Sequence, residues 1–217
     1  MIRAENDSRD LLHRMILSYT APMKKKLFIG ANWKMNPPPK GSMSEGSPYF
    51  SDGNPEIVVF PTFIDMQNCI RSGQLIVGAQ CARAEPGGAF TGDISMKALK
   101  EFGCGYVLCG HSERRQHHEE SDAFVALQVR SALECGLTPV LCIGENADQR
   151  EMGETQEVLR RQLEIVSQTT GMIVAYEPVW AIGTGKTPTA EEANETHAFI
   201  WSLLKDKTTQ IIYGGSM

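Results

Sequence analysis

Seven short apolar runs recur along this chain, and polar or helix-like segments separate them. The runs are almost continuously apolar, a pattern typical of parallel strands that are buried on both faces. They are Leu27–Ala31, Ile57–Phe60, Leu75–Ala79, Tyr106–Cys109, Pro139–Ile143, Ile173–Tyr176 and Gln210–Tyr213. Helix-like stretches stand between them at Ser95–Phe102, Asp122–Cys135, Thr155–Thr169 and Thr189–Lys205. Because strand and helix patterns alternate, the sequence predicts a right-handed, parallel α/β fold.

Two segments depart from this alternation. The connection Pro37–Pro55 is rich in Pro, Gly and Ser, so it predicts a loop or a partly disordered linker in place of a crossover helix. Residues 1–25 lack the order of regions found in a signal peptide and are interpreted as an appended helix or a disordered extension. Met23 is an alternative start. The expected division is therefore an extension at 1–25 and one α/β domain at 26–217.

Composition narrows the class of protein. With 217 residues, of which 41% are hydrophobic, the chain can bury one sizeable core. Its net charge of −5 argues against a nucleic-acid partner, and no apolar run approaches the roughly 20 residues needed to cross a bilayer. The six cysteines include no Cys-x-x-Cys pair and lie mostly in apolar runs. We therefore expect reduced core thiols, no metal site, no membrane contact and a cytoplasmic location.

One carboxylate, Glu177, ends the sixth apolar run, and Pro178 follows it at once. Proline has no N–H to donate to a strand ladder, so the strand is expected to end there. Val179–Ile182 is too apolar for an ordinary solvated turn, and Gly183–Thr187 adds backbone freedom and exposed N–H groups. This order predicts a buried base, an apolar flap and a glycine hinge suited to bind an anion.

Two nucleotide-binding motifs do not fit the same stretch. A P-loop requires glycine where Trp180 stands, and a dinucleotide fingerprint requires glycine where Pro188 stands. An ordinary loop after a strand is the plainer alternative, which the tryptophan and the paired glycines together disfavour.

Polar residues also end the first and fourth runs. Asn32 and Lys34 follow the first run, and the apolar neighbours of Lys34 favour a fixed cation over a surface lysine. His111 and Glu113 follow the fourth run. A lone histidine is more often structural, but His111 follows a glycine and opens a polar cluster, which favours a catalytic role. Active sites of barrels of parallel strands gather at such carboxyl ends.

Six motifs, in this order along the chain, resemble triosephosphate isomerase, and the resemblance runs from about Lys26 to Met217. The motifs are Gly30–Asn36, Gly88–Ile94, Gly110–Arg115, Leu141–Glu145, Ala175–Lys186 and Tyr213–Ser216. The resemblance implies a TIM (β/α)8 barrel, here incomplete with about seven parallel strands, because nothing after Ser216 matches the eighth. Seven strands would leave the first and the last as open edges.

The same resemblance implies an isomerase of glycolysis and gluconeogenesis. It would interconvert dihydroxyacetone phosphate and glyceraldehyde 3-phosphate through an enediol, without a cofactor or a metal. Glu177 matches the base that moves the proton, and His111 matches the neutral imidazole that polarises the carbonyl oxygens. Lys34, with Asn32 beside it, matches the cation that stabilises the oxyanion and contacts the substrate. Glu113 matches the carboxylate that orders this group.

Further matches concern the phosphate group, the lid and a second subunit. Gly183 and Ser216 match contacts to the substrate phosphate. The lid comprises Pro178, Val179, Trp180, Ala181, Ile182, Gly183 and Thr184. Thr91 matches the tip of a loop that inserts into a partner, and Phe90 beside it is an apolar residue that a solvated tip would not favour. A homodimer is therefore expected.

Two other functions stay open at this point. The chain could be a truncated, catalytically inactive relative that acts as a binding protein or is an incomplete gene product. The missing strand favours that interpretation, whereas the presence of every reacting group favours an enzyme. A different sugar-phosphate enzyme on the same barrel would predict changes around Glu177 and His111, and the sequence has none.

Overall fold

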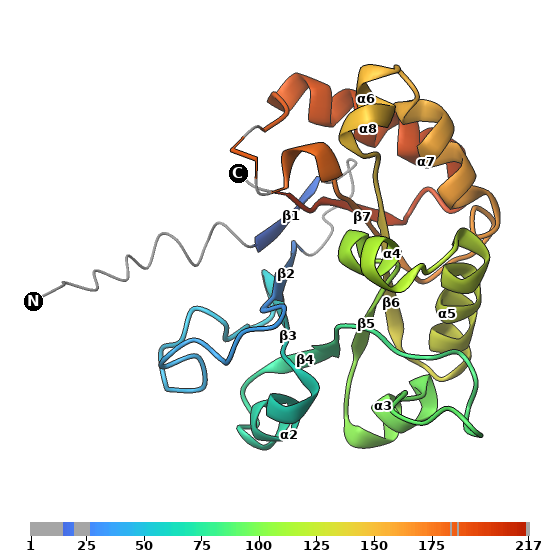
Figure 1. The fold of residues 1–217 in the computed structure, drawn as a ribbon. Helices are drawn as coiled ribbons and strands as arrows, with labels where there is room; N and C mark the ends of the chain where they lie inside the picture. Colours follow the sequence, from blue (N-terminus) through green and yellow to red (C-terminus); the bar gives the residue numbers. More distant parts are fainter. Residues whose placement is uncertain (1–14, 20–26, 183, 186, 216–217) are drawn as a thin grey trace, which may run out of the picture.

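The computed structural model describes residues 15–19, 27–182, 184–185 and 187–215; for Met15–Tyr19 it describes the backbone alone. Eight strands form a closed barrel in the order in which they occur in the chain (Figure 1). They are β1 (Met15–Tyr19), β2 (Phe28–Asn32), β3 (Glu56–Phe60), β4 (Ile76–Ala79), β5 (Tyr106–Cys109), β6 (Thr138–Ile143), β7 (Ile173–Tyr176) and β8 (Gln210–Tyr213).

The seven strands from β2 to β8 are parallel to one another, as the apolar runs predicted. Their observed bounds differ from the predicted bounds by at most one residue at either end. Because the strands are parallel, all seven carboxyl ends lie at one rim of the barrel. Asn32, for example, pairs in register with Phe60 at the end of the neighbouring strand.

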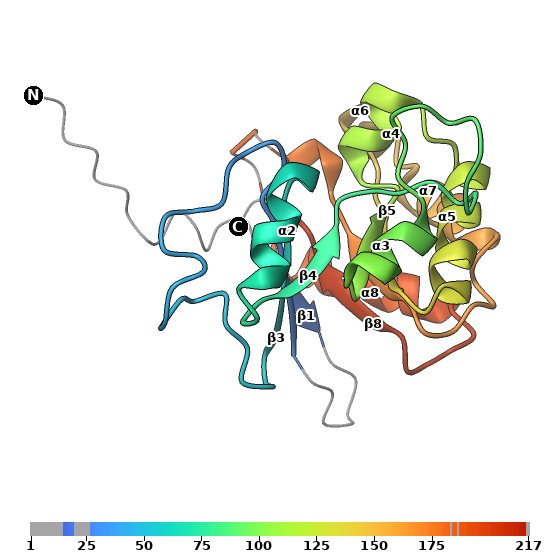
Figure 2. The same ribbon diagram turned by 90° about the horizontal axis from the view of Figure 1, so that it is seen from below.

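The expectation of two open edges is wrong, because β1 occupies the gap between β2 and β8 (Figures 1 and 2). It pairs antiparallel with both, through Met15 opposite Ala31 on one side and Leu17 opposite Tyr213 on the other. The physical reason for this pairing is that the edges of β2 and β8 would otherwise present unpaired N–H and C=O groups, which are a template for a further strand. The prediction of an appended helix or a disordered extension at 1–25 is therefore wrong for Met15–Tyr19, which form a strand. Residues 1–14 and 20–25 lie outside the described residues.

Helices pack around the outside of the barrel (Figure 2). They are α2 (Phe63–Arg71), α3 (Met96–Phe102), α4 (Ser112–His118), α5 (Asp122–Glu134), α6 (Ala147–Glu151), α7 (Thr155–Glu164), the 3₁₀ turn η1 (Val179–Ala181) and α8 (Ala190–Leu203). The predicted helix starts are confirmed by their caps, since Ser95 accepts a hydrogen bond from the Ala98 N–H and Thr189 forms a capping box with Glu192. The α7 helix ends at Glu164, five residues earlier than its pattern predicted.

The connection between β2 and β3 contains turns and no helix, as its composition predicted. It is nevertheless attached to the core at Tyr49, which is buried and packs edge-on against Trp33 with the ring centroids 5.5 Å apart. The buried Ser47 hydroxyl donates a hydrogen bond to the Ser42 carbonyl and so folds the connection back on itself. Through Tyr49 and Met43 the segment thereby packs against the outer apolar layer without a crossover helix.

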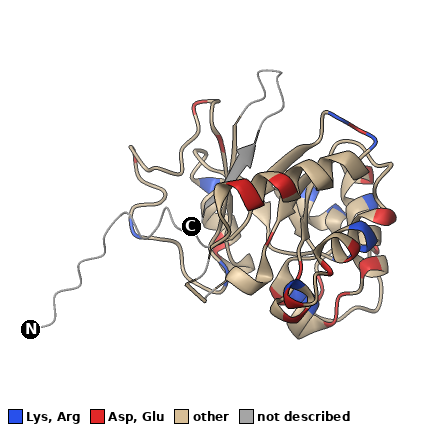
Figure 3. Cartoon of the chain, turned by 90° about the horizontal axis from the view of Figure 1, so that it is seen from above, with Lys and Arg blue, Asp and Glu red and all other residues tan. Residues whose placement is uncertain are grey.

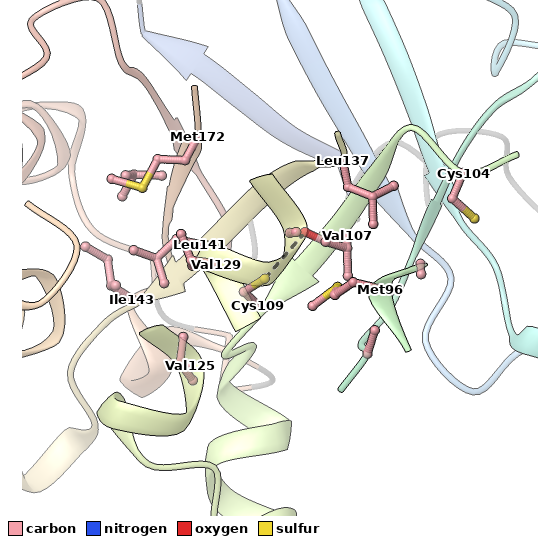
Figure 4. Close-up of a cluster of buried hydrophobic side chains, with 14 of the residues drawn as sticks. Met96, Cys104, Val107, Cys109, Val125, Val129, Leu137, Leu141, Ile143 and Met172 are labelled. Carbon is pink, nitrogen blue, oxygen red and sulfur yellow. Dashed lines mark hydrogen bonds between the residues drawn. The ribbon is translucent and has the colours of Figure 1, made fainter. Parts of the chain in front are cut away.

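Alternate residues along the strands supply two apolar layers. One layer fills the barrel and includes Phe60, Leu108 and Val140, and the other packs under the helices. Figure 4 shows part of the outer layer, in which Cys109 and Leu141 face Val125 and Val129 of α5. Each of the six cysteines is a free thiol, and four of them are buried.

The outer surface carries mixed charge. Segments with lysine or arginine and segments with aspartate or glutamate both occur on the helices (Figure 3). None of the helices in the described ranges combines the length and apolar character needed to cross a bilayer.

Candidate active site

Polar side chains from the ends of β2, β5 and β7 meet at one rim of the barrel. Lys34 lies two residues after β2, His111 two residues after β5, and Glu177 directly after β7. A chain of contacts joins them, from Lys34 to Glu113, from Glu113 to His111 and from His111 to Glu177. The structure therefore brings together the predicted residues of three separate motifs.

Lys34 has a strained backbone conformation that several contacts hold in place. Its φ of 51° lies in the left-handed region, which costs a residue with a side chain about 1–3 kcal/mol. The Asn32 side-chain oxygen accepts a hydrogen bond from the Lys34 N–H at 2.9 Å. The Gln80 amide donates to the carbonyls of Lys34 and Phe60 at 2.8 and 2.9 Å. Such strain is commonly stored at functional sites, so the site positions this ammonium at a cost in stability.

The Lys34 ammonium is paired with a carboxylate. Its Nζ lies 2.6 Å from Oε1 of Glu113. Burial of the Glu113 carboxyl favours its neutral form, but the hydrogen bond and the charge of Lys34 outweigh burial and lower its pKa below the ordinary 4.5. Glu113 is therefore ionised at neutral pH and fixes the position of the ammonium.

His111 caps the first turn of α4 and is almost fully buried. Its Nδ1 accepts a hydrogen bond from the Glu113 N–H at 3.3 Å. In the neutral ring this leaves Nε2 as the nitrogen that carries the hydrogen. Nε2 lies 3.3 Å from Oε1 of Glu177, so the ring presents a hydrogen-bond donor to the same space as the carboxylate.

Glu177 is 4% exposed, and both of its carboxylate oxygens have a partner. Oε2 accepts a hydrogen bond from the Ser112 N–H at 3.0 Å, while Oε1 faces His111. The Glu177 N–H donates to the Ile143 carbonyl at 2.7 Å. A Cβ atom on Gly144 would lie only 1.7 Å from the Glu177 carbonyl oxygen, so the close approach of these two backbones requires glycine. The carboxylate is therefore placed by rigid neighbours at the ends of β6 and β7.

The predicted lid begins as the 3₁₀ turn η1 and is tied to a buried carboxylate. Trp180 Nε1 donates to Oε1 of Glu145 at 2.9 Å, and the Tyr176 hydroxyl donates to the same carboxylate at 3.1 Å. The guanidinium of Arg150 stacks over the Trp180 ring at 4.9 Å. Burial, together with the charge of Glu145, raises the pKa of Tyr176. The lid is thus held by polar contacts that a movement would have to break.

A cavity of about 520 Å³ opens beside Glu177. Its wall includes Gly110, Ser112, Arg115, Gln162, Glu177 and Val179. The candidate carboxylate therefore borders open space on one side and the barrel rim on the other.

Several predicted residues do not join this cluster. Phe90 is half buried under the guanidinium of Arg83, 4.0 Å from its ring centroid, and Thr91 is exposed. Gly183 and Ser216 lie outside the described residues, so their predicted phosphate contacts stay predictions.

Two contributors were missed by sequence reasoning. Gln80 lies just after β4, and only the folded chain brings it beside Lys34. Glu145 belongs to a quoted motif, but nothing in that motif indicated that it would anchor Trp180. Both residues follow strand ends, and this position was the one sign in the sequence that they could contribute to the site.

A buried carboxylate, an imidazole N–H donor and a fixed cation are the groups needed to move a proton next to a carbonyl and to stabilise the oxyanion that results. In the part of the chain that the structure describes, no group of three or more His, Cys, Asp or Glu side chains is placed to hold a metal ion. Fold and site together define the class of α/β-barrel proteins that carry acid–base groups at the carboxyl ends of their strands.

Comparison with known proteins identifies the family. The family described as triosephosphate isomerase matches residues 27–217. The triosephosphate isomerase of Delftia acidovorans is 42% identical over 212 residues, which cover 90% of this chain and 85% of that protein. That of Thiobacillus denitrificans is 42% identical over 215 residues and that of Coxiella burnetii 38% over 217, with 90% of this chain covered in each case and 85% and 84% of those proteins. The chain belongs to the triosephosphate isomerase family.

Proposed function

We propose that this protein interconverts dihydroxyacetone phosphate and glyceraldehyde 3-phosphate through an enediol intermediate. The observation that carries the proposal is the contact between the buried side chains of Glu177 and His111, with Nε2 3.3 Å from Oε1. Family membership supports the same reaction, which belongs to glycolysis and gluconeogenesis. A carboxylate base beside a neutral imidazole is a well-known feature of this family, so the assignment follows the family and the geometry agrees with it.

The proposed roles follow from chemistry at each atom. Glu177 removes the proton next to the carbonyl and returns it to the adjacent carbon. His111 donates from Nε2 to the substrate oxygens, and Lys34 stabilises the negative charge that develops on them. Asn32 fixes the Lys34 backbone and contacts substrate, and Glu113 orders the ammonium and the ring.

The remaining roles concern the phosphate and water. Gly183 and Ser216 are proposed to bind the phosphate through backbone N–H groups. Residues 178–184 act as the lid that excludes water from the enediol, because an exposed enediol phosphate would lose its phosphate group. Protein side chains and backbone supply all of this chemistry, so we propose no cofactor and no metal.

The inactive-relative alternative has no specific observation in its favour. It was based on an open barrel, and β1 closes the barrel. The groups needed for proton transfer also lie within contact of one another.

The test is a steady-state assay of the purified full chain and of Glu177→Gln, which keeps the shape of the side chain and removes its basicity. We expect kcat to fall by at least about 10²-fold while KM changes little. Glu164→Gln, at the far end of α7, is the control and should retain parental turnover. Parental turnover in Glu177→Gln would overturn the proposal.

We further propose a homodimer that uses the loop around Phe90 and Thr91. Two large apolar side chains elsewhere on the described surface support an interface, since Met35 is 94% exposed and Ile64 is 88% exposed. Sedimentation of the double variant Phe90→Asp, Thr91→Glu should show less dimer than the parent. Identical sedimentation of the parent and the double variant would show that this loop does not form the dimer interface.

We also propose a cytoplasmic location. The predicted boundary between an extension at 1–25 and a barrel domain at 26–217 needs one change, because β1 (Met15–Tyr19) belongs to the barrel. Free thiols in all six cysteines are consistent with a reducing compartment.

A further inference from the structure

Arg115 of α4 reaches from the outer side of the barrel to the backbones beside two candidate catalytic residues. Its side chain is 17% exposed. Nε donates to the Gly110 carbonyl at 2.8 Å, and one terminal nitrogen donates to the Cys142 carbonyl at 3.4 Å. Gly110 directly precedes His111. Cys142 is the second-last residue of β6, and the carbonyl of the next residue, Ile143, accepts a hydrogen bond from the Glu177 N–H.

The local backbone is shaped to admit this guanidinium. Gly110 has a φ of 69°, and a Cβ atom there would lie 2.9 Å from a terminal nitrogen of Arg115 and 2.8 Å from Val125. Glycine therefore removes the atom that would push the arginine away. The flat guanidinium can then bond two carbonyls and a carboxylate from three different nitrogens, whereas a lysine would have to reach all three acceptors from a single nitrogen.

The charge of Arg115 is neutralised on its outer side. One terminal nitrogen lies 2.5 Å from Oδ1 of Asp122, the first residue of α5. The other oxygen of Asp122 lies 3.2 Å from Nε of Arg161, whose side chain is 57% exposed. Arg161 thus shares the ion-pair partner of Arg115 but, within the described part of the chain, donates no hydrogen bond to either carbonyl, which makes it a matched control.

We propose that Arg115 is a positioning residue that keeps His111 and Glu177 in the correct mutual arrangement by tying together the ends of β5 and β6. This inference rests on the proposed function, because it concerns the same reaction. In this role the arginine acts through its hydrogen bonds to the Gly110 and Cys142 carbonyls. A small displacement of a catalytic group lowers the rate of the chemical step more than it lowers substrate binding.

The kinetic test compares Arg115→Met, Arg115→Lys, Asp122→Asn and Arg161→Met in the full chain. We expect kcat to fall about 10- to 100-fold in Arg115→Met with KM within about twofold of the parent, and to recover only in part in Arg115→Lys. Asp122→Asn and Arg161→Met break the ion pairs and leave the carbonyl contacts, so both should keep kcat within about threefold. An unchanged kcat in Arg115→Met, or an equal loss in Asp122→Asn, would overturn the proposal.

A second measurement is independent of turnover and of the fate of any one variant. Nitrogen-15 NMR of the histidine rings reports the environment of Nδ1 and Nε2 in the free protein. The His111 signals should shift in Arg115→Met and Arg115→Lys and stay in place in Arg161→Met. Unmoved His111 signals in folded Arg115 variants would overturn the positioning role even if the parent were an isomerase. If the His111 signals shift in the Arg115 variants but the parent itself has no isomerase activity, the result would instead count against the proposed function.

Discussion

Nζ of Lys34 lies 2.6 Å from Oε1 of Glu113, although Lys34 follows β2 and Glu113 lies in the first turn of α4. The contact links the strained backbone of Lys34 to the turn that carries His111. Proper placement of the cation and of the imidazole therefore depends on one carboxylate.

Replacing that carboxylate should weaken catalysis. Glu113→Gln removes the charge that holds the ammonium, and we expect kcat/KM to fall at least about tenfold. Because the pKa of Glu113 is lowered, the pair is complete above pH 4.5 and is lost only as the pH falls through that lowered value. The kcat/KM profile of the parent should therefore show no step from this group above pH 5. Glu101→Gln, in the exposed pair with Lys97, is the control, and an equal effect there would refute the assignment.

Gly144 should tolerate no side chain. In Gly144→Ala the added methyl would lie 1.7 Å from the Glu177 carbonyl, so the backbone of the candidate base must shift. We expect at least about a 10²-fold loss of kcat and a lower melting temperature. Gly105→Ala is a matched control, because nothing lies within 4 Å of its added carbon. Parental kinetics in Gly144→Ala would mean that the ends of β6 and β7 are more tolerant than their packing indicates.

Trp180 should report movement of the lid. Closure on substrate requires its hydrogen bond to Glu145 and its stacking on Arg150 to change. Phosphoglycolate, a phosphate-bearing analogue of the enediolate, should alter tryptophan fluorescence and protect Val179–Ile182 from hydrogen exchange. The fluorescence change should disappear in Trp180→Phe, because Trp33 and Trp201 lie on other segments. No protection at saturating analogue would argue against a lid.

His197 should make stability depend on pH. Burial lowers its pKa to about 4 from an ordinary 6.5, so the native ring is neutral, while the unfolded chain binds a proton below pH 6.5. The stabilising contribution is complete above pH 6.5 and is lost as the pH falls towards 4, by about 3 kcal/mol in all. Urea unfolding at pH 7.5 and 4.5 should therefore show a smaller pH dependence in His197→Gln than in the parent. The exposed His118→Gln should retain the parental dependence.

Removing the residues before Met23 should open the barrel. The variant lacks β1, so the backbones of β2 and β8 lose their antiparallel partner. We expect poor solubility and loss of a cooperative thermal transition, since a typical free energy of unfolding is only about 5–15 kcal/mol. A sharp melt with parental turnover would show that β1 is dispensable.

The parallel strands could be predicted because each is buried on both faces and leaves an uninterrupted apolar run. The α4 helix could not, because its sequence, Ser112–His118, contains no apolar residue and no buried residue that would give a helical period. Its residues order the site through caps and ion pairs, which depend on tertiary neighbours.

In the candidate site, too, some residues could be predicted from the sequence and others could not. Glu177, His111 and Lys34 follow strand ends, a position from which the sequence alone could predict a place in the candidate site. Gln80 and Arg115 act on carbonyl groups, and any residue presents a carbonyl, so no side-chain pattern marks their targets. β1 was missed because its partners, β2 and β8, are set by the closure of the whole barrel.

The antiparallel β1 strand also sets the order in which the barrel can be completed during synthesis. β1 and β2 are neighbours in sequence, so they can pair as a hairpin soon after both leave the ribosome. The other edge of β1 must wait for β8, which is made last among the described strands, and Leu17 then meets Tyr213. Among the described strands, the pairing of β1 with β8 spans the most sequence and is also the last to become possible. Until it forms, β8 presents an unpaired edge to neighbouring nascent chains.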